Sequence, residues 1–259
     1  MTDRRVAIVL AASKGLGRGC AEALAAQGFR LVICARNREG VDEAVASIHR
    51  NGGDAVGCAA DVSKTVDIST VFELADKTYG RVDVLVANAG GPLPGAFESV
   101  TEEAWRQAFE LTLMSAVRSI NLAIPRMRTT GYGRIIVLGS SSVRMPLPNL
   151  ALSNVFRPGL VGAVKTLAVE LAGDNITVNM VSPGRVDTDR VRSLDEGRAK
   201  REGTSYEEAR SRSERAIPMG RYGRPADVGE LVAFLASEGS GYITGQSILV
   251  DGGLVPSLP

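Results

Sequence analysis

Histidine and cysteine are scarce in this sequence, and their scarcity limits the chemistry that the chain can perform. His49 is the only histidine among 259 residues, and it lies in a polar stretch typical of a helix end. The three cysteines, Cys20, Cys34 and Cys58, are widely spaced and form no C-x-x-C motif. Such spacing supports neither a disulfide framework nor a zinc site. We therefore expect no metal ion, no histidine-based catalysis and a reducing, cytoplasmic location.

The sequence also lacks an excess of charge and any long apolar run. Its 30 basic and 29 acidic residues leave a formal net charge of +1, which gives no bulk attraction to nucleic acid or to an anionic membrane. The apolar run at residues 6–12 follows Arg4 and Arg5 as in a secretion signal, but it is short and a glycine turn follows it. We expect neither a nucleic-acid nor a membrane partner.

Short apolar runs alternate with longer amphipathic segments along almost the whole chain. The expected strands are residues 6–10, 30–34, 55–59, 82–87, 134–138, 177–181 and 247–250. This alternation is typical of β-α units, and right-handed crossovers place helices on both faces of the resulting sheet. We expect an α/β fold with one Rossmann-type, doubly wound parallel sheet of about seven strands in a three-layer sandwich, forming a single domain over residues 1–259.

One segment, residues 188–216, breaks this rhythm. It is densely charged and offers few candidates for a core. A long insertion of this kind inside a compact domain is typically functional and can carry short helices. We expect a mobile loop that covers a substrate.

The turn after the first expected strand has the pattern of a phosphate-binding loop. Gly15 and Gly17 follow the apolar run, and a helical pattern begins directly after them. Glycines let backbone N–H groups approach a pyrophosphate, and the helix contributes the positive end of its dipole. A glycine pair alone is equally compatible with a tight β-α turn. The motifs farther along the chain favour the first interpretation.

These motifs together resemble those of the short-chain dehydrogenase/reductase family, most closely its 3-oxoacyl-carrier-protein reductase branch, over essentially the full length. The matching pieces are Gly15-Leu16-Gly17, Ala60-Asp61-Val62, Ala87-Asn88-Ala89-Gly90, Ser140, Pro183-Gly184, Thr188, Gly220-Arg221-Tyr222-Gly223-Arg224-Pro225, Ile243-Thr244-Gly245-Gln246 and Asp251-Gly252-Gly253. The resemblance implies that a nicotinamide dinucleotide is bound by Ser13, Lys14, Gly15, Leu16, Gly17, Arg36, Asp61, Val62, Asn88, Ala89, Gly90, Arg157, Pro183, Gly184, Val186 and Thr188.

The head of the phosphate loop departs from the family pattern. The family has Thr-Gly where this chain has Leu10-Ala11. If the backbone torsion at Ala11 is ordinary, the change is small. We then expect the loop still to close on a dinucleotide, but to bind it less tightly.

The end of the second strand predicts which nicotinamide nucleotide is bound. An acidic residue there binds the ribose diol and repels a 2′-phosphate. This chain has Ala35-Arg36-Asn37 and no carboxylate, so Arg36 and Lys14 could clamp the phosphate from two sides. We predict NADP(H) over NAD(H). The alternative is that Arg36 is a solvated residue at a helix start.

The catalytic positions implied by the resemblance carry unusual residues. The family uses a serine, a tyrosine, a lysine four residues later and an asparagine on an earlier helix. Counting along matching segments places these positions at Ser140, Ser153, Arg157 and Thr112, so only the serine is kept. A serine hydroxyl is a weaker acid than a phenol, and its side chain reaches less far. Arginine is also a poorer proton relay than lysine. A water molecule could occupy the space of the missing ring.

Pro158 directly follows Arg157 and cannot donate to the carbonyl of Asn154. We expect the helix either to start near this proline or to be kinked there. Tyr132, Tyr206 and Tyr222 offer no obvious replacement for the missing tyrosine, because they lie at the wrong end of the sheet or in and beyond the charged segment.

Two functions remain compatible with these residues. The first is an NADP(H)-dependent oxidoreductase that interconverts a carbonyl and a hydroxyl group on a small molecule, with an acyl thioester among the candidate substrates. The second is an NADP(H)-binding protein of the same fold with little or no turnover, in a regulatory or structural role. The resemblance also implies a homotetramer formed through the helix at residues 226–237 and the last strand.

Overall fold

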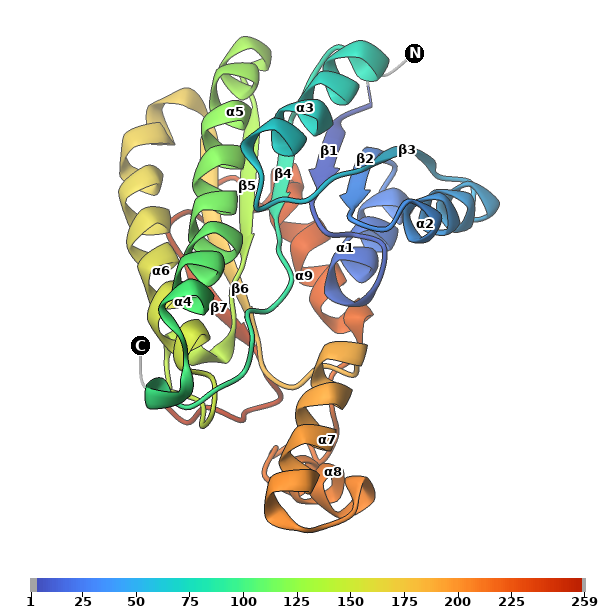
Figure 1. The fold of residues 1–259 in the computed structure, drawn as a ribbon. Coiled ribbons are helices and arrows are strands. Elements are labelled where there is room, and N and C mark those ends of the chain that lie inside the picture. Colours follow the sequence, from blue (N-terminus) through green and yellow to red (C-terminus); the bar gives the residue numbers. More distant parts are fainter. Residues whose placement is uncertain (1–3, 258–259) are drawn as a thin grey trace.

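A seven-stranded parallel sheet forms the centre of the computed structural model, which describes residues 4–257 (Figure 1). The strands are β1 Val6–Val9, β2 Arg30–Ala35, β3 Asp54–Ala59, β4 Val84–Ala87, β5 Gly133–Leu138, β6 Ile176–Pro183 and β7 Ser247–Val250. All neighbouring pairs are parallel, in the order β3-β2-β1-β4-β5-β6-β7. The α/β fold and its doubly wound sheet are therefore confirmed, with small differences at the strand ends.

Helices cover both faces of the sheet and make it the middle of three layers (Figure 1). On one face lie α1 Gly15–Ala26, α2 Arg38–Arg50 and α9 Pro225–Ala236, and on the other α3 Thr65–Tyr79, α5 Ser115–Thr130 and α6 Ala151–Leu171. Every residue of β1, β4, β5 and β6 is buried. This is why these strands appear in the sequence as continuous apolar runs rather than as alternating patterns.

Shorter elements complete the chain between the main helices and strands. They are α4 Glu102–Ala108, a π-helical segment Phe109–Met114, and 3₁₀ turns at Phe97–Ser99, Ser141–Val143, Ala172–Asp174 and Glu238–Ser240. The strand order reverses between β1 and β4, and ligands of open α/β sheets bind in the crevice beyond the carboxyl ends at such a switch point. The loops that follow β1, β4, β5 and β6 all reach this edge.

The charged segment 188–216 folds into two helices, α7 Asp189–Glu202 and α8 Tyr206–Arg215. Figure 1 shows them in orange, projecting beyond the carboxyl ends of the strands. The expected short helices are present, whereas the mobility of the segment stays a prediction. Within residues 4–257, no helix combines the length and the apolar character needed to cross a membrane.

Candidate functional site

The glycine turn after β1 is tightly closed against the loop after β4. A Cβ atom added at Gly17 would lie 2.2 Å from the carbonyl oxygen of Ala11, so only glycine fits there. Asn88 donates from Nδ2 to the carbonyl oxygens of Leu10 and Ala11, at 3.1 and 3.2 Å. Gly15 has a φ of +57° and faces the side chain of Thr188. The predicted phosphate loop is thus held in one shape by a residue from the neighbouring strand.

Ala11 has a φ of +50°, in the left-handed region. Our expectation of a small change rested on an ordinary torsion at this position, and that premise is wrong. The Cβ atom of alanine makes this conformation costly, whereas glycine adopts it freely. The turn therefore stores strain at Ala11, and its closure on a dinucleotide stays a prediction.

The start of α1 is open to an anion. Lys14 is the N-cap residue, and its side chain makes no capping hydrogen bond to the first-turn N–H groups. These groups and the helix dipole attract negative charge. The Lys14 ammonium instead forms an exposed ion pair with Asp189 at 3.0 Å. A clamp by Lys14 and Arg36 requires this pair to open, so the clamp stays a prediction.

A cation, Arg36, follows β2, and no residue of this strand carries a carboxylate. Arg36 is exposed there, and Asn37 caps α2 by accepting from the Gly40 amide at 2.8 Å. Ser13 lies against Gly40, beside the same helix start. Burial raises the pKa of Asp61, but hydrogen bonds from Ser63 and the charge of Arg36 outweigh burial, so that the net shift is downward. The binding of a ribose phosphate by Ser13 and Arg36 stays a prediction.

The segment after β6 approaches the glycine turn from the other side. A Cβ atom added at Gly184 would lie 2.6 Å from the Cβ atom of Asp251, so this glycine permits close backbone packing. Val186 is buried and forms a bridge with Gly223. Thr188 accepts from the Val191 amide and caps α7. Three further predicted cofactor-binding residues lie at the same sheet edge. Val62 follows β3 and is buried, whereas Ala89, half-buried, and Gly90, exposed, follow β4.

Ser153 lies beside a serine that the sequence analysis did not select. Its Oγ atom is 3.2 Å from Oγ of Ser142, and both residues are buried. Ser140 accepts from the Ser142 amide at 3.1 Å, so its own hydroxyl proton remains available for donation. The structure thus joins Ser140, Ser142 and Ser153 into one hydroxyl cluster at the carboxyl end of β5. The 3₁₀ turn Ser141–Val143 creates this cluster by turning Ser142 back toward α6.

Arg157 holds the end of β5 with one of its terminal nitrogens. Its Nη1 atom donates to the carbonyl oxygens of Leu138 and Gly139, each at 2.9 Å. Burial of the guanidinium, followed by the positive charge of Arg190, lowers the pKa of Arg157 to about 10. The side chain therefore stays protonated at neutral pH, and its Nε and Nη2 atoms remain available to a ligand.

Thr112 carries a buried hydroxyl without a partner. Thr112 is 4% exposed. Its Oγ1 atom is buried and forms no hydrogen bond with any group in residues 4–257. Thr112 lies in the π-helical segment Phe109–Met114, and π-helical turns recur at functional sites. A buried polar atom without a partner calls for an explanation, and a bound water or ligand atom supplies one.

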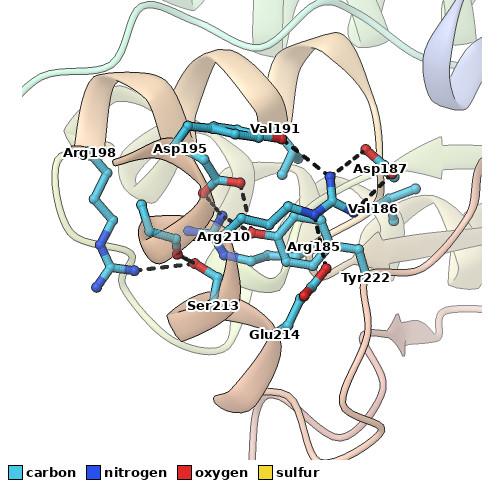
Figure 2. A network of polar contacts seen from close by, with 12 residues as sticks. Arg185, Val186, Asp187, Val191, Asp195, Arg198, Arg210, Ser213, Glu214 and Tyr222 are labelled. Atoms are coloured by element: carbon cyan, nitrogen blue, oxygen red, sulfur yellow. Dashed lines mark hydrogen bonds and ion pairs between the residues drawn. The ribbon is translucent and has the colours of Figure 1, made fainter. Parts of the chain in front are cut away.

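The α7–α8 segment is held to the loop after β6 by a network of charged side chains (Figure 2). Asp195 is fully buried, accepts from Arg185 at 2.5 Å and accepts from the Tyr222 hydroxyl at 2.7 Å. Arg210 donates to both carboxylate oxygens of Asp187 and to Glu214. Because Arg185 and Asp187 belong to the loop that ends at Thr188, this network fixes both helices to the candidate site.

The tyrosine hydroxyls are engaged elsewhere, and α6 begins before the proline, so that of our two expectations only the kink at Pro158 stays a prediction. Tyr132 donates to the carbonyl of Ala236, and Tyr206 accepts from Arg210 in α8. α6 begins at Ala151 and passes through Pro158, so a helix start near the proline is wrong. Within residues 4–257, no group of three or more His, Cys, Asp or Glu side chains could hold a metal ion.

Arg190 is a second cation that the sequence analysis did not select. It lies in the first turn of α7, and its Nη2 atom donates to the carbonyl of Pro92. Nothing in its own sequence segment predicts this contact, because Pro92 is remote in the chain. The three successive serines at 140–142, by contrast, were a visible signal for Ser142, since each was an equal candidate to face α6.

Comparisons with known proteins agree with the fold described above. Residues 10–255 match the family described as Enoyl-(Acyl carrier protein) reductase. The chain is 34% identical over 250 residues to dehydrogenase/reductase SDR family member 4 of Homo sapiens, covering 96% of this chain and 87% of that protein. It is 33% identical over 258 residues to the NADPH-dependent reductase BacG of Bacillus subtilis, covering 99% and 100%. The crystal structure of an actinorhodin polyketide ketoreductase with NADPH gives a TM-score of 0.96 at 34% identity, covering 99% of both chains.

Proposed function

The chain belongs to the short-chain dehydrogenase/reductase family, and on that premise we propose that it is an NADP(H)-dependent oxidoreductase that interconverts a carbonyl and a hydroxyl group on a small molecule. The observation that carries the proposal is the hydroxyl cluster of Ser140, Ser142 and Ser153, which lies beside Arg157 at the carboxyl end of β5. Two similar proteins, BacG and the actinorhodin ketoreductase, are described with NADPH.

The residues of this chain fit a dinucleotide. The uncapped N–H groups of α1 form a cradle for a pyrophosphate, and Gly17 keeps the turn before them tight, because a Cβ atom there would meet the carbonyl oxygen of Ala11. Arg36, exposed at the end of β2, is placed to bind a ribose 2′-phosphate with Ser13 and, after its ion pair opens, Lys14. Asn88, Pro183, Gly184, Val186 and Thr188 then line the path toward the nicotinamide.

The reaction needs a hydrogen on carbon and a proton on oxygen. NADPH, when bound, would supply a hydride to the carbonyl carbon, and the substrate oxygen would take one proton from the protein or solvent. Ser140 can donate a hydrogen bond to that oxygen, because its Oγ atom already accepts from the Ser142 amide. The charge of Arg157 stabilises the alkoxide that develops. A water bound at Oγ1 of Thr112 would deliver the proton that a tyrosine delivers in the family pattern.

A second function has its own supporting observation. The phenol that acts as the acid in the family pattern has no counterpart in the cluster, because Tyr132, Tyr206 and Tyr222 are bonded elsewhere. Arg157 is bonded to two strand carbonyls. These contacts support an NADP(H)-binding protein with little or no turnover, which is the alternative to the proposed enzyme.

Consumption of NADPH separates the two functions. Both predict that the purified protein changes NADPH fluorescence and prefers NADPH over NADH. Only the enzyme consumes NADPH steadily with acetoacetyl thioesters or a panel of ketones. An Arg157→Ala variant that folds and still binds NADPH but loses turnover would support the enzyme. If the Ser153→Tyr and Arg157→Lys double variant gained an activity that the parent lacks, the non-catalytic alternative would hold.

We also propose that residues 1–259 form one domain, that the α7–α8 segment covers the substrate, and that the protein is a homotetramer. Phe234 on α9 is 47% exposed, and Tyr242, which precedes the edge strand β7, is fully exposed. Apolar side chains exposed on these elements support an interface through α9 and β7. Light scattering after size exclusion tests the assembly, and a monomer would contradict it.

A further inference from the structure

Two arginines of the candidate site have no acidic partner. Arg157 and Arg190 are partly or largely withdrawn from solvent, and neither forms an ion pair with any residue in the range 4–257. Their hydrogen bonds go to backbone carbonyls instead, from Arg157 to Leu138 and Gly139 and from Arg190 to Pro92. A carbonyl dipole offsets only part of the cost of withdrawing a positive charge from water.

Arg190 is held in place by close packing. A Cβ atom added at Gly91 would lie 2.8 Å from Nε and 3.1 Å from Cζ of Arg190, so the guanidinium rests on the bare backbone of this glycine. Pro92, its hydrogen-bond acceptor, is the next residue. The guanidinium is therefore fixed by two successive residues after β4, yet Nε and Nη1 keep N–H groups for a ligand.

The two cations lie at the carboxyl ends of neighbouring strands. β4 pairs with β5 in parallel, with Ala87 opposite Val137, and the segments that follow carry the contacts of Arg190 and of Arg157. The positive charge of Arg190 lowers the pKa of Arg157, so the two guanidinium groups repel each other. Burial lowers the pKa of both arginines. An anion bound beside them would relieve both costs through charge-assisted hydrogen bonds.

We propose that Arg190, supported by the charge of Arg157, binds a carboxylate of the substrate, so that the substrates are oxo acids and the corresponding hydroxy acids rather than neutral ketones or thioesters. The inference rests on the proposed oxidoreductase function and specifies its substrate class. The other anion expected here is the cofactor pyrophosphate. It fits the glycine turn and the start of α1, whereas Arg190 rests on Gly91 after β4, close enough to Arg157 for its charge to lower the pKa of Arg157.

Binding to the complex of the protein with NADP⁺ tests the proposal without requiring turnover. We compare acetoacetate with its methyl ester, and phenylpyruvate with its methyl ester, by calorimetry. We expect each acid to bind about tenfold more tightly than its ester, as one charge-assisted hydrogen-bonded pair provides. Arg190→Met should abolish the difference, and Arg190→Lys should retain part of it. Arg192→Met, an exposed arginine on the same helix, is the control that should leave it unchanged.

A second variant tests the geometry without removing the charge. Gly91→Ala places a Cβ atom against Arg190, so the guanidinium must move, and we expect the preference for the acid to fall while NADP⁺ still binds. Equal binding of acid and ester to the wild type would overturn the proposal. So would a loss of NADPH affinity in Arg190→Met with an unchanged acid-to-ester ratio, because the arginine would then serve the dinucleotide.

The same measurements separate this inference from the proposed function. If the acids bind selectively but no NADPH is consumed with any of them, the carboxylate site stands and the oxidoreductase proposal fails. If neutral ketones are reduced and no acid is preferred, the oxidoreductase proposal stands and the carboxylate site fails.

Discussion

Two polar regions at the same end of the sheet are built in opposite ways. In the network that joins α7 and α8 to the loop after β6, four arginines have acidic partners: Arg185 pairs with Asp195, Arg210 with Asp187 and Glu214, and Arg198 and Arg212 with Glu202. In the candidate site, Arg157 and Arg190 have none within residues 4–257, and the hydroxyl of Thr112 has no hydrogen-bond partner there.

This difference distinguishes polar groups that support structure from polar groups that await a ligand. A buried charge with a partner resists change, because removing the partner leaves the charge uncompensated. A buried polar group without a partner costs stability rather than adding to it, and it is available for binding. Backbone strain is likewise found where a ligand is expected, since Ala11, with its φ of +50°, lies in the candidate nucleotide site. The following substitutions test this division.

The largest effect is expected for Asp195→Asn in the paired region. Asparagine keeps the shape but removes the charge opposite Arg185, and we expect a loss of about 2 to 3 kcal/mol, somewhat less than for a pair buried on both sides. The Arg185 side chain is 28% exposed, which is the reason for the discount. Hydrogen exchange of the amides in α7 and α8, together with thermal unfolding, measures the loss. The control Glu196→Gln removes an exposed charge from the same helix and should change little.

An intermediate effect of opposite sign is expected for Ala11→Gly. Removing the left-handed strain of alanine stabilises the folded state by about 1 to 2 kcal/mol. This exceeds the cost of the greater conformational entropy that glycine gives the unfolded chain, so we expect the free energy of unfolding to rise by about 0.5 to 1 kcal/mol. Chemical denaturation measures it, and NADPH titration should show equal or tighter binding. Ala12→Gly is the matched control, because Ala12 is buried and not among the residues with positive φ. It should destabilise, and a loss in Ala11→Gly as well would contradict the assignment of strain.

The smallest effect on stability is expected for Thr112→Val. Valine has the same shape, and the hydroxyl it replaces has no partner, so the free energy of unfolding should change by less than about 0.5 kcal/mol. Turnover should fall more than substrate affinity, because the proposed water loses its anchor. Ser115→Ala removes the partnered hydroxyl of a nearby residue and should cost about 1 kcal/mol. A larger loss in Thr112→Val than in Ser115→Ala would reverse the comparison.

The sheet could be predicted from the sequence because each of its strands is an apolar run between helical patterns. The two helices of segment 188–216 also left a local signal. Ser205 and Glu208 form a capping box, and Arg198 with Glu202 and Arg210 with Glu214 are spaced four residues apart. We interpreted the same charges mainly as a sign of a loop, since few of the residues are apolar.

The arrangement of side chains in the candidate site could not be predicted. Residue identity does not reveal the sign of φ at Ala11, and the spacing of Ser140 and Ser153 does not reveal that Ser142 lies next to Ser153. The contact of Arg190 with Pro92 joins elements remote in the chain. Each of these features depends on tertiary packing, whereas the order of the motifs is a property of the sequence itself.

The packing of Arg190 on Gly91 also has a genetic consequence. The space above the glycine backbone is filled by one particular side chain, so the two positions should show epistasis. In a combinatorial library, a larger residue at position 91 should displace the guanidinium while position 190 is arginine and should have little effect once position 190 is small. Any attempt to redirect the specificity of this protein should therefore vary the two codons together, because the effect of a change at one position depends on the residue at the other.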